Sequence, residues 1–259
     1  MSQPTLKDLL AVAIEAAYLG GRRSLAYFNC KVDIETKADN TPVTRADRET
    51  EELIRQRIAR SFPTHSIVGE EHGTTDGDKA YRWIIDPIDG TKTFVCGVPF
   101  YGTLIGVEVH GQPAAGVVYL PAFDEMIWAG SGTGCFWNGR PAHVSSVSRL
   151  EDAVLLTTSV SSCQGRSDAY DRLAGRTKLQ RTWGDCYGYA LVATGRAEIM
   201  LDPAMKPWDC GPLLTILDEA GGHFTTWNGE ATIWGPDACA TNGALHKEVL
   251  DVLKNENRK

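Results

Sequence analysis

Apolar positions recur with two different spacings along the first half of the chain. Spacings of three and four predict a helix that begins at Pro4-Thr5 and weakens at Gly20-Gly21, and a second helix over about 44–60 that begins at Thr44. Shorter apolar runs without that period predict strands at 66–69, 82–86, 103–109, 113–119 and 125–129. The Gly-rich stretch 131–141 is typical of a hairpin.

The second half alternates between the two kinds of element. Strands are predicted at 153–157, 197–201, 223–226 and 238–241, and helices at 168–175, 186–194, 209–220 and 244–253. We therefore expect a layered α/β (α+β) protein, with an α+β half over 1–145 and an α/β half over 146–259. No flexible linker separates the halves, so we expect one tightly packed unit with a site between them.

Composition limits the partners. The chain has 259 residues, of which 42% are hydrophobic, so it can bury a sizeable core. A net charge of -7 argues against nucleic acid or an anionic membrane as partner, although a small phosphorylated substrate is compatible if bound cations reverse the local charge. Seven scattered cysteines without a C-x-x-C pair favour reduced thiols in a cytoplasmic protein. Neither a signal peptide nor a membrane span is predicted.

The stretch WIIDPIDGTKTF, Trp83 to Phe94, ends an apolar run with two carboxylates three residues apart, Asp86 and Asp89. Pro87 stiffens the turn between them, and Gly90 frees the backbone after them. Such a segment holds carboxylates rigidly at a strand end. Further acidic positions are Asp47 in PVTRAD, Glu70-Glu71 in VGEE and Asp209 in PWD.

Each of these further positions has a purely structural alternative. Asp47 fits a capping box with Thr44, Glu70-Glu71 fits a solvated loop, and Asp209 fits a helix N-cap. Carboxylates that converge would repel one another unless cations join them. Ligation by oxygen alone favours Mg²⁺, or Mn²⁺ as a substitute, over zinc.

Hard cations at such a site supply what phosphate-ester hydrolysis requires. They polarise the phosphoryl oxygens, lower the pKa of water and stabilise the leaving alkoxide. The N–H groups of Gly90 and Thr91 could hold phosphate oxygens, and the Thr91 hydroxyl could orient the attacking water.

Five segments together resemble the inositol monophosphatase-like family of metal-dependent phosphatases. They are Lys37 followed by PVTRAD, VGEE (68–71), WIIDPIDGTKTF, GDCYGYALVATGRAEIMLDPAMKPWD and EAGG (219–222), in the family's order over almost the whole chain. The resemblance implies an αβαβα sandwich of the inositol monophosphatase/fructose-bisphosphatase type. It also implies a cytoplasmic homodimer that hydrolyses small phosphomonoesters by direct attack of a metal-activated water.

The resemblance also assigns roles within the acidic constellation. Glu70, Asp86 and the Ile88 carbonyl resemble a first Mg²⁺ site, and Asp86, Asp89 and Asp209 resemble a second. Glu70 resembles part of a weaker third site. Asp47, Glu70 and Thr91 resemble the catalytic group, in which Asp47 and Thr91 position the nucleophilic water. Gly90 and Thr91 resemble the phosphate cradle, so the substrate contacts Glu70, Ile88, Asp89 and Asp209 as well.

The wall that holds the substrate alcohol is expected in the late block, at Arg181, Gly184, Asp185, Cys186 and Asp202. Asp185 departs from the small-residue pattern of the inositol enzymes, and GDCYGY with KPWD resembles the histidinol-phosphate phosphatase branch. Two acids suit a cation, because a charge-assisted hydrogen bond is roughly twice as strong as a neutral one. The sequence therefore predicts L-histidinol phosphate, an intermediate of histidine biosynthesis, as substrate.

Several alternatives stay open at this point. The enzyme could be an inositol monophosphatase or a related small polyol or nucleotide phosphatase. Asp185 could be the N-cap of the helix at 186–194, and Arg181 could contact the substrate or brace Asp185. A haloacid-dehalogenase-like phosphatase begins its motif D-x-D-G-T, whereas here the spacing is D-x-x-D-G-T. No P-loop motif occurs. An inactive metal-binding scaffold would have lost site residues, whereas every position here carries a competent one.

Overall fold

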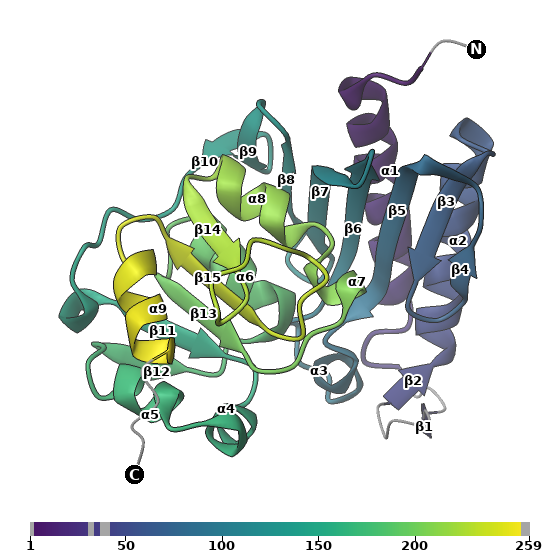
Figure 1. Ribbon diagram of the computed structural model, residues 1–259. Helices are drawn as coiled ribbons and strands as arrows, with labels where there is room; N and C mark the ends of the chain where they lie inside the picture. The colour runs from purple at the N-terminus through teal and green to yellow at the C-terminus, as the bar shows by residue number, and fades with distance from the viewer. Residues whose placement is uncertain (1–2, 31–33, 37–41, 255–259) are drawn as a thin grey trace.

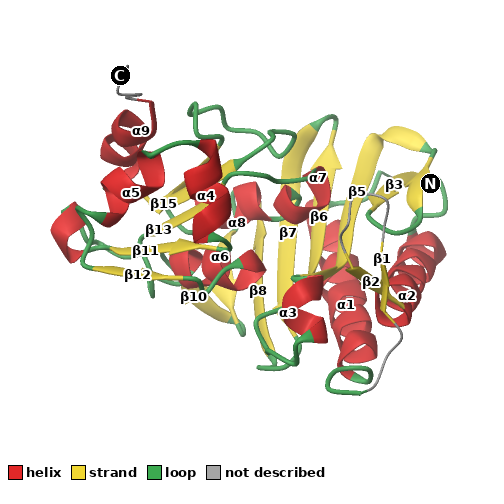
Figure 2. Cartoon of the chain, turned by 90° about the horizontal axis from the view of Figure 1, so that it is seen from below, coloured by secondary structure: helices red, strands yellow, loops and turns green. Residues whose placement is uncertain are grey.

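The computed structural model describes residues 3–30, 34–36 and 42–254. Two large β-sheets alternate with three layers of helices, as Figures 1 and 2 show. Lys37, one of the residues that carried the family resemblance, lies outside the described ranges. The layered α/β class and the αβαβα sandwich predicted from the sequence are confirmed.

The first sheet has eight strands in the order β10-β9-β8-β7-β6-β5-β3-β4. Their bounds are β3 (His65–Gly69), β4 (Gly73–Thr75), β5 (Asp78–Asp89), β6 (Gly102–Val109), β7 (Gln112–Leu120), β8 (Glu125–Gly130), β9 (Gly134–Trp137) and β10 (Arg140–Ala142). The predicted hairpin at 131–141 is confirmed as β9 and β10. A separate two-stranded sheet joins β1 (Ile34–Thr36) to β2 (Pro42–Thr44).

The second sheet has five strands in the order β12-β11-β13-β15-β14. Their bounds are β11 (Val154–Thr157), β12 (Leu179–Arg181), β13 (Ile199–Asp202), β14 (Gly222–Thr225) and β15 (Ala238–Asn242). The sequence pattern does not predict four of the strands, β1, β2, β4 and β12, because each is only three residues long.

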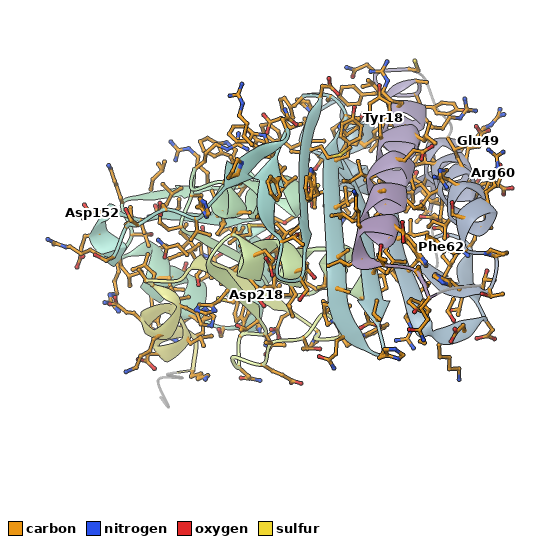
Figure 3. The ribbon with its side chains drawn as sticks, turned by 90° about the horizontal axis from the view of Figure 1, so that it is seen from above. Tyr18, Glu49, Arg60, Phe62, Asp152 and Asp218 are labelled. Atoms are coloured by element: carbon orange, nitrogen blue, oxygen red, sulfur yellow. The ribbon has the colours of Figure 1, made fainter. Side chains whose placement is uncertain are left out.

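Helices α1 (Leu6–Leu25) and α2 (Arg45–Ser61) cover the outer face of the first sheet. Trp83 and Ile85 of β5 point toward them, while Ile84 between these two residues points to the opposite face. Since both faces of β5 are buried, its sequence is continuously apolar instead of alternating. Figure 3 shows α1 lying across the sheet.

The predicted weakening of α1 at Gly20-Gly21 is wrong, because the helix continues to Leu25. A Cβ at Gly20 would lie 2.6 Å from Cδ1 of Ile54, and a Cβ at Gly21 would lie 2.3 Å from Cδ1 of Tyr119. The two glycines therefore allow α1 to approach both α2 and the sheet closely.

The middle layer lies between the two sheets and holds α6 (Asp185–Ala193), α7 (Pro207–Cys210) and α8 (Leu213–Glu219). The sequence predicts one continuous helix over 209–220, and this is wrong. The break falls at Gly211-Pro212, because Pro212 has no N–H to continue the helical hydrogen bonds. The break leaves Asp209 in a short helix of its own.

The outermost layer covers the far face of the second sheet. It holds α4 (Val160–Arg166), α5 (Ala169–Ala174) and α9 (His246–Lys254), with a 3-10 helix over Leu150–Asp152. The short helix α3 (Thr91–Val95) follows β5 directly. Over the described residues, none of the helices is both long and apolar enough to cross a membrane.

Candidate active site

The end of β5 holds Asp86 and Asp89 on the two sides of a bulge. Asp86 pairs with Leu104 of β6 and Asp89 pairs with Gly102, so two residues of β5 lie opposite one residue of β6. Residues three apart in a regular strand point to opposite faces, and the extra residue brings the two carboxylates to the same face. The strand therefore continues past Asp86, where the sequence predicts its end.

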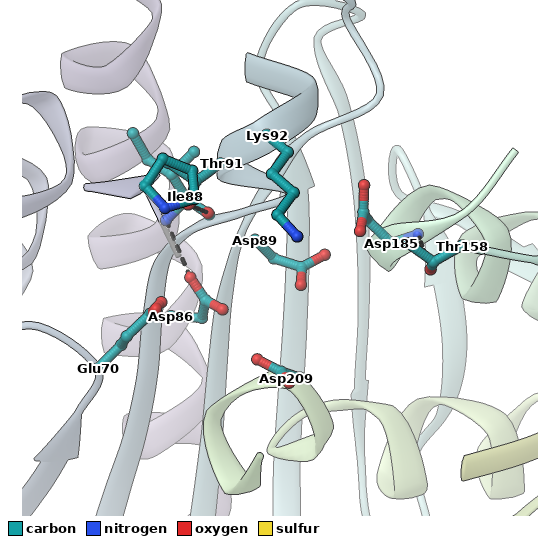
Figure 4. Close-up of a pocket in the computed structure, with 11 residues that line it drawn as sticks. Glu70, Asp86, Ile88, Asp89, Thr91, Lys92, Thr158, Asp185 and Asp209 are labelled. Atoms are coloured by element: carbon teal, nitrogen blue, oxygen red, sulfur yellow. Dashed lines mark hydrogen bonds between the residues drawn. The ribbon is translucent and has the colours of Figure 1, made fainter. Parts of the chain in front are cut away.

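Asp209 approaches the two β5 carboxylates from the opposite side, on α7. One carboxylate oxygen each from Asp86, Asp89 and Asp209 lies within 4.8 Å of the other two. Glu70, which directly follows β3, lines the same cavity of about 270 Å³. Figure 4 shows these four side chains pointing toward a common space. The structure thus brings together acidic residues from three separate parts of the chain.

This convergence is electrostatically unfavourable without a cation. Burial raises the pKa of Asp86 well above its usual range, and the neighbouring charges of Glu70, Asp89 and Asp209 raise it further. Burial also raises the pKa of Asp89, and it raises the pKa of Asp209 to about 6. The cluster of Asp86, Asp89 and Asp209 offers carboxylate oxygens, which fit hard divalent cations.

Asp47 caps α2 and also contacts Thr91. It is buried completely, and its Oδ2 accepts hydrogen bonds from the Thr44 N–H at 2.8 Å and the Thr44 hydroxyl at 2.6 Å. These bonds form the predicted capping box at the start of α2, which is confirmed. Its other oxygen, Oδ1, accepts a hydrogen bond from the Thr91 hydroxyl at 3.3 Å. Burial raises the pKa of Asp47 against the opposing effect of these hydrogen bonds.

Asp209 is also held by a hydrogen bond at a helix start. It is the third residue of α7, and its Oδ2 accepts a hydrogen bond from the Lys206 N–H at 2.8 Å. Lys206, and not Asp209, is the N-cap, so the N-cap alternative is wrong. The capping bond fixes the side chain while the carboxylate still faces the cluster.

Gly90 and Thr91 form the turn between β5 and α3. Gly90 has a φ of 84°, a left-handed conformation that glycine adopts without steric cost. A Cβ there would also lie 2.9 Å from Oδ2 of Asp185. The Thr91 hydroxyl can also donate to the Ile88 carbonyl, at 3.1 Å. Ile88, Gly90, Thr91 and Asp185 all line the cavity of about 270 Å³ that also holds Glu70, and we call it the central cavity.

Asp185 opens α6, with Gly184 as the N-cap, so the alternative reading of Asp185 as an N-cap is wrong. Its Oδ2 instead accepts a hydrogen bond from the Thr93 hydroxyl at 2.8 Å, and its N–H donates to the Thr158 hydroxyl at 2.8 Å. The N–H of Cys186, the next residue, donates to Oδ2 of Asp89. The start of α6 is thereby tied to the acidic cluster.

Asp202 lies at the end of β13 and is almost fully buried. Its Oδ1 accepts from the Thr158 N–H at 3.1 Å, and its Oδ2 accepts from the Tyr189 hydroxyl at 2.9 Å. Burial raises its pKa to about 7. Asp202, Asp185, Cys186 and the cluster residues Asp89 and Asp209 line a second cavity of about 130 Å³.

Gly184 lines neither of these two cavities, and the structure does not bring Arg181 to them either. The Arg181 side chain is exposed, its guanidinium donates to the Gln180 carbonyl at 2.7 Å, and it lies 6.0 Å from the Trp183 ring. Among the described residues, those that line the two cavities do not include Arg181. β12, which carries it, ends at Arg181 itself and turns it outward.

Three residues that line the central cavity are not predicted from the sequence: Pro42, Lys92 and Thr158. Figure 4 shows the Lys92 side chain extending toward the acidic residues of this cavity. Lys92 also lowers the pKa of Asp185, against the larger effect of burial. The signal in the sequence that could have identified Lys92 is its position directly after Gly90-Thr91. Thr158 follows β11, and residues beyond the carboxyl ends of strands often form sites in α/β proteins.

Almost the whole chain matches a known family. The model of the inositol monophosphatase family covers residues 5–258. The chain belongs to this family. Its members are metal-dependent phosphatases, in agreement with the acidic cluster of Asp86, Asp89 and Asp209.

Curated relatives and solved structures support this membership. A histidinol-phosphatase of Chlorobaculum parvum is 39% identical over 96% of this chain and 98% of its own. A histidinol-phosphatase of Mycobacterium tuberculosis is 42% identical over 85% and 87%. An IMPase structure from Thermotoga maritima has a TM-score of 0.87 at 33% identity, covering 95% of this chain and 96% of its own. The extragenic suppressor protein suhB from Bartonella henselae gives a TM-score of 0.89 at 28% identity over 95% and 98%.

In this family member, a buried ion pair holds the turn that carries Glu70. Glu51 of α2 is completely buried and accepts a hydrogen bond from Nε of Arg55 at 2.7 Å. The same carboxylate accepts from the N–H groups of Glu71 at 2.7 Å and His72 at 3.2 Å. Glu51 therefore fixes the backbone immediately after Glu70.

We expect Glu51→Gln to lower the free energy of unfolding by about 3 kcal/mol, since it leaves the Arg55 charge unpaired at a mostly buried site. Denaturant unfolding followed by circular dichroism measures this loss. Glu52→Gln, one residue away but exposed, is the matched control and should change stability by no more than about 0.5 kcal/mol. Equal losses in both variants would mean that the ion pair contributes nothing specific.

Proposed function

We propose that this chain is a Mg²⁺-dependent phosphatase that hydrolyses L-histidinol phosphate to L-histidinol and phosphate by direct attack of water. The observation that carries the proposal is the second, acid-lined cavity, which opens from the carboxylate cluster and includes Asp185 and Asp202. The two histidinol-phosphatase relatives, at 39% and 42% identity, support the same substrate.

The metal would be held by residues that the fold already places together. Glu70, Asp86 and the Ile88 carbonyl would hold one Mg²⁺, and Asp86, Asp89 and Asp209 would hold a second. Glu70 could share a third ion. Bound there, Mg²⁺ supplies Lewis-acid polarisation of the phosphoryl group and neutralises the charge of the cluster.

Asp47 and Thr91 would position the attacking water. Asp47 is anchored through Oδ2 by two hydrogen bonds from Thr44, so its Oδ1 stays fixed toward Thr91. When the Thr91 hydroxyl donates to this oxygen, its lone pairs face away from Asp47 and can accept a hydrogen bond from water. A buried carboxylate kept in this way can also take a proton from the water as it attacks.

The phosphate would lie against the turn at the start of α3. The N–H groups of Gly90 and Thr91 are donors at that turn, and Gly90 leaves the backbone uncovered by a side chain. Lys92 adds a positive charge in the same cavity. Together these groups attract a doubly charged phosphate into a region that is otherwise acidic.

The alcohol part would be recognised through its ammonium group. Asp185 lines both the central and the acid-lined cavity, and its Oδ2 accepts from the Thr93 hydroxyl. Asp202 has both oxygens engaged by Thr158 and Tyr189, so it serves mainly to hold the wall. We therefore assign the direct ammonium contact to Asp185.

Asp185→Asn tests this assignment. For histidinol phosphate it should cost about 1.5–3 kcal/mol of transition-state stabilisation, the range for a hydrogen bond to a charged group, and this loss appears as a lower kcat/KM. Hydrolysis of inositol monophosphate, whose alcohol is neutral, should change less than about threefold. Steady-state kinetics with both substrates measures the difference.

The wild-type enzyme decides between the two candidate substrates. A higher kcat/KM for inositol monophosphate than for histidinol phosphate would contradict the proposed substrate and favour the inositol or small-polyol alternative. The exposed Asp152, at the far end of the molecule in Figure 3, provides a control variant, Asp152→Asn, that should leave both substrates unaffected.

A further inference from the structure

A third cavity opens on the other side of Asp185. It has a volume of about 590 Å³ and shares Lys92, Thr158 and Asp185 with the central cavity. Thr158 and Asp185 line all three cavities, including the acid-lined one. The space beyond the phosphate site therefore divides into two branches at Thr158 and Asp185.

The two branches differ in chemistry. The acid-lined branch is bounded by Asp89, Asp185, Asp202 and Asp209. The larger branch is bounded by the apolar side chains of Val98, Phe100 and Trp183 and by hydroxyl groups, with Lys92 and Asp185 as its charged residues, both shared with the central cavity. These hydroxyl groups belong to Thr93, Ser159, Ser162 and Thr182. One branch suits a cation, and the other suits a flat apolar group with polar edges.

The apolar wall of the larger branch is partly open and partly rigid. Trp183 is 38% exposed and Val98 is 37% exposed, so their surfaces are available to a ligand. Phe100 is held by stacking on Tyr187, with ring centroids 4.6 Å apart and planes 2° apart. A rigid ring and an available indole form a surface on which an aromatic group can stack.

We propose that the larger branch binds the imidazole ring of the substrate through Trp183 and Phe100, while the acid-lined branch binds its ammonium group. This assignment rests on the proposed function. In histidinol phosphate the ammonium and the imidazolylmethyl group are attached to the same carbon, next to the CH₂–O–phosphate. The two substituents diverge from one atom, as the two cavities diverge at Thr158 and Asp185.

Size and polarity favour this orientation over the reverse one. The ring is the bulkier substituent, and the larger branch has about 590 Å³ against about 130 Å³ for the acid-lined branch. Imidazole titrates near pH 6.5, so above neutral pH it is mostly uncharged and gains little from four carboxylates. The ring can stack on Trp183 while its N–H donates to a hydroxyl such as that of Ser159 or Ser162.

Four phosphomonoesters separate the two branches in a kinetic experiment. Histidinol phosphate has the ring and the ammonium, phosphoethanolamine has only the ammonium, the phosphate ester of imidazolylpropanol has only the ring, and inositol monophosphate has neither. Trp183→Ala should lower kcat/KM about tenfold for the two ring-bearing substrates and leave the other two within about twofold. Asp185→Asn should show the complementary pattern, with losses for the two ammonium-bearing substrates.

Two further variants exclude a general structural effect. Trp183→Phe keeps an aromatic surface and should recover most of the loss. Trp234→Ala removes another exposed tryptophan, which donates to Glu108 and does not line any of the three cavities, and should leave the ratios between substrates unchanged.

Equal losses of Trp183→Ala on all four substrates, or no loss on any, would overturn the ring assignment even if histidinol phosphate is the preferred substrate. A change of oligomeric state in Trp183→Ala, measured by light scattering, would also overturn it, because a second copy of the chain would then cover this branch. A wild-type preference for inositol monophosphate would instead reject the proposed function. The ratio between imidazolylpropyl phosphate and phosphoethanolamine would still test the ring site in that case.

Discussion

Asp86→Asn is expected to lower kcat by about three orders of magnitude, more than any other single substitution in the acidic cluster. Asp86 is shared between the two proposed metal sites and is 2% exposed. Loss of several kcal/mol of metal-dependent transition-state stabilisation corresponds to that factor, since about 1.36 kcal/mol changes a rate tenfold. Steady-state kinetics at saturating Mg²⁺ measures it.

Thermal unfolding distinguishes this loss from misfolding. The pKa of Asp86 is raised in the folded state, so its stabilising contribution is present at low pH and is lost as pH rises through the folded pKa. At neutral pH in chelator, Asp86→Asn should therefore be at least as stable as wild type. Mg²⁺ should raise the Tm of wild type, and much less that of the variant.

Asp78, at the opposite end of the same strand, provides the matched control. It is exposed, and its Oδ1 accepts a hydrogen bond from the Ala80 N–H at 2.9 Å. Asp78→Asn should retain both the activity and the Mg²⁺-induced rise in Tm. Full activity of wild type in the presence of chelator, or of Asp86→Asn, would contradict the metal assignment.

Asp47→Asn is expected to lower kcat by a factor of about 10² to 10³ while Mg²⁺ binding is retained. The factor is that of a lost general base or water-positioning group. The amide can still cap α2 through its carbonyl oxygen, but its NH₂ group then faces the Thr91 hydroxyl and cannot accept a proton. Calorimetric titration of Mg²⁺ and steady-state kinetics, taken together, test both parts.

Asp8 offers an unusually close control for this variant. It occupies the same position in the capping box of α1 that Asp47 occupies in α2, but it is exposed and distant from the site. Asp8→Asn should cost about 1 kcal/mol of stability and leave kcat unchanged. Loss of Mg²⁺ binding in Asp47→Asn would show instead that Asp47 is a metal ligand.

The elements of this fold were largely predictable because their signals are local. The capping box of Thr44 and Asp47 fixes the start of α2, and the period of the apolar positions fixes which face is buried. The errors arose where tertiary packing decides the outcome. Gly20-Gly21 reads as a helix end, but the close approach of Ile54 and Tyr119 makes these glycines part of the helix interface.

The site was predictable in composition but not in geometry. Sequence spacing alone cannot show that a bulge at Pro87-Ile88 turns Asp86 and Asp89 to one face, because spacing does not reveal the register with β6. Arg181 was assigned to the wall from its position near Asp185, yet β12 leaves it exposed. Thr158 had no local motif, and it belongs to the site because β11 ends beside the start of α6.

The sequence by itself determined the chemical character of this protein. It specified a set of carboxylate side chains, the turn at Gly90-Thr91 and a family, since these depend on residue types and on order along the chain. The tertiary structure alone decided which of those groups meet. It joined carboxylates that are up to 139 positions apart, from Glu70 to Asp209, and it formed two further cavities, one acidic and one partly aromatic, that meet the central cavity at Thr158 and Asp185. The physical reason is that residue type fixes what a side chain can bind, whereas the packing of two sheets against shared helices fixes the distances between side chains.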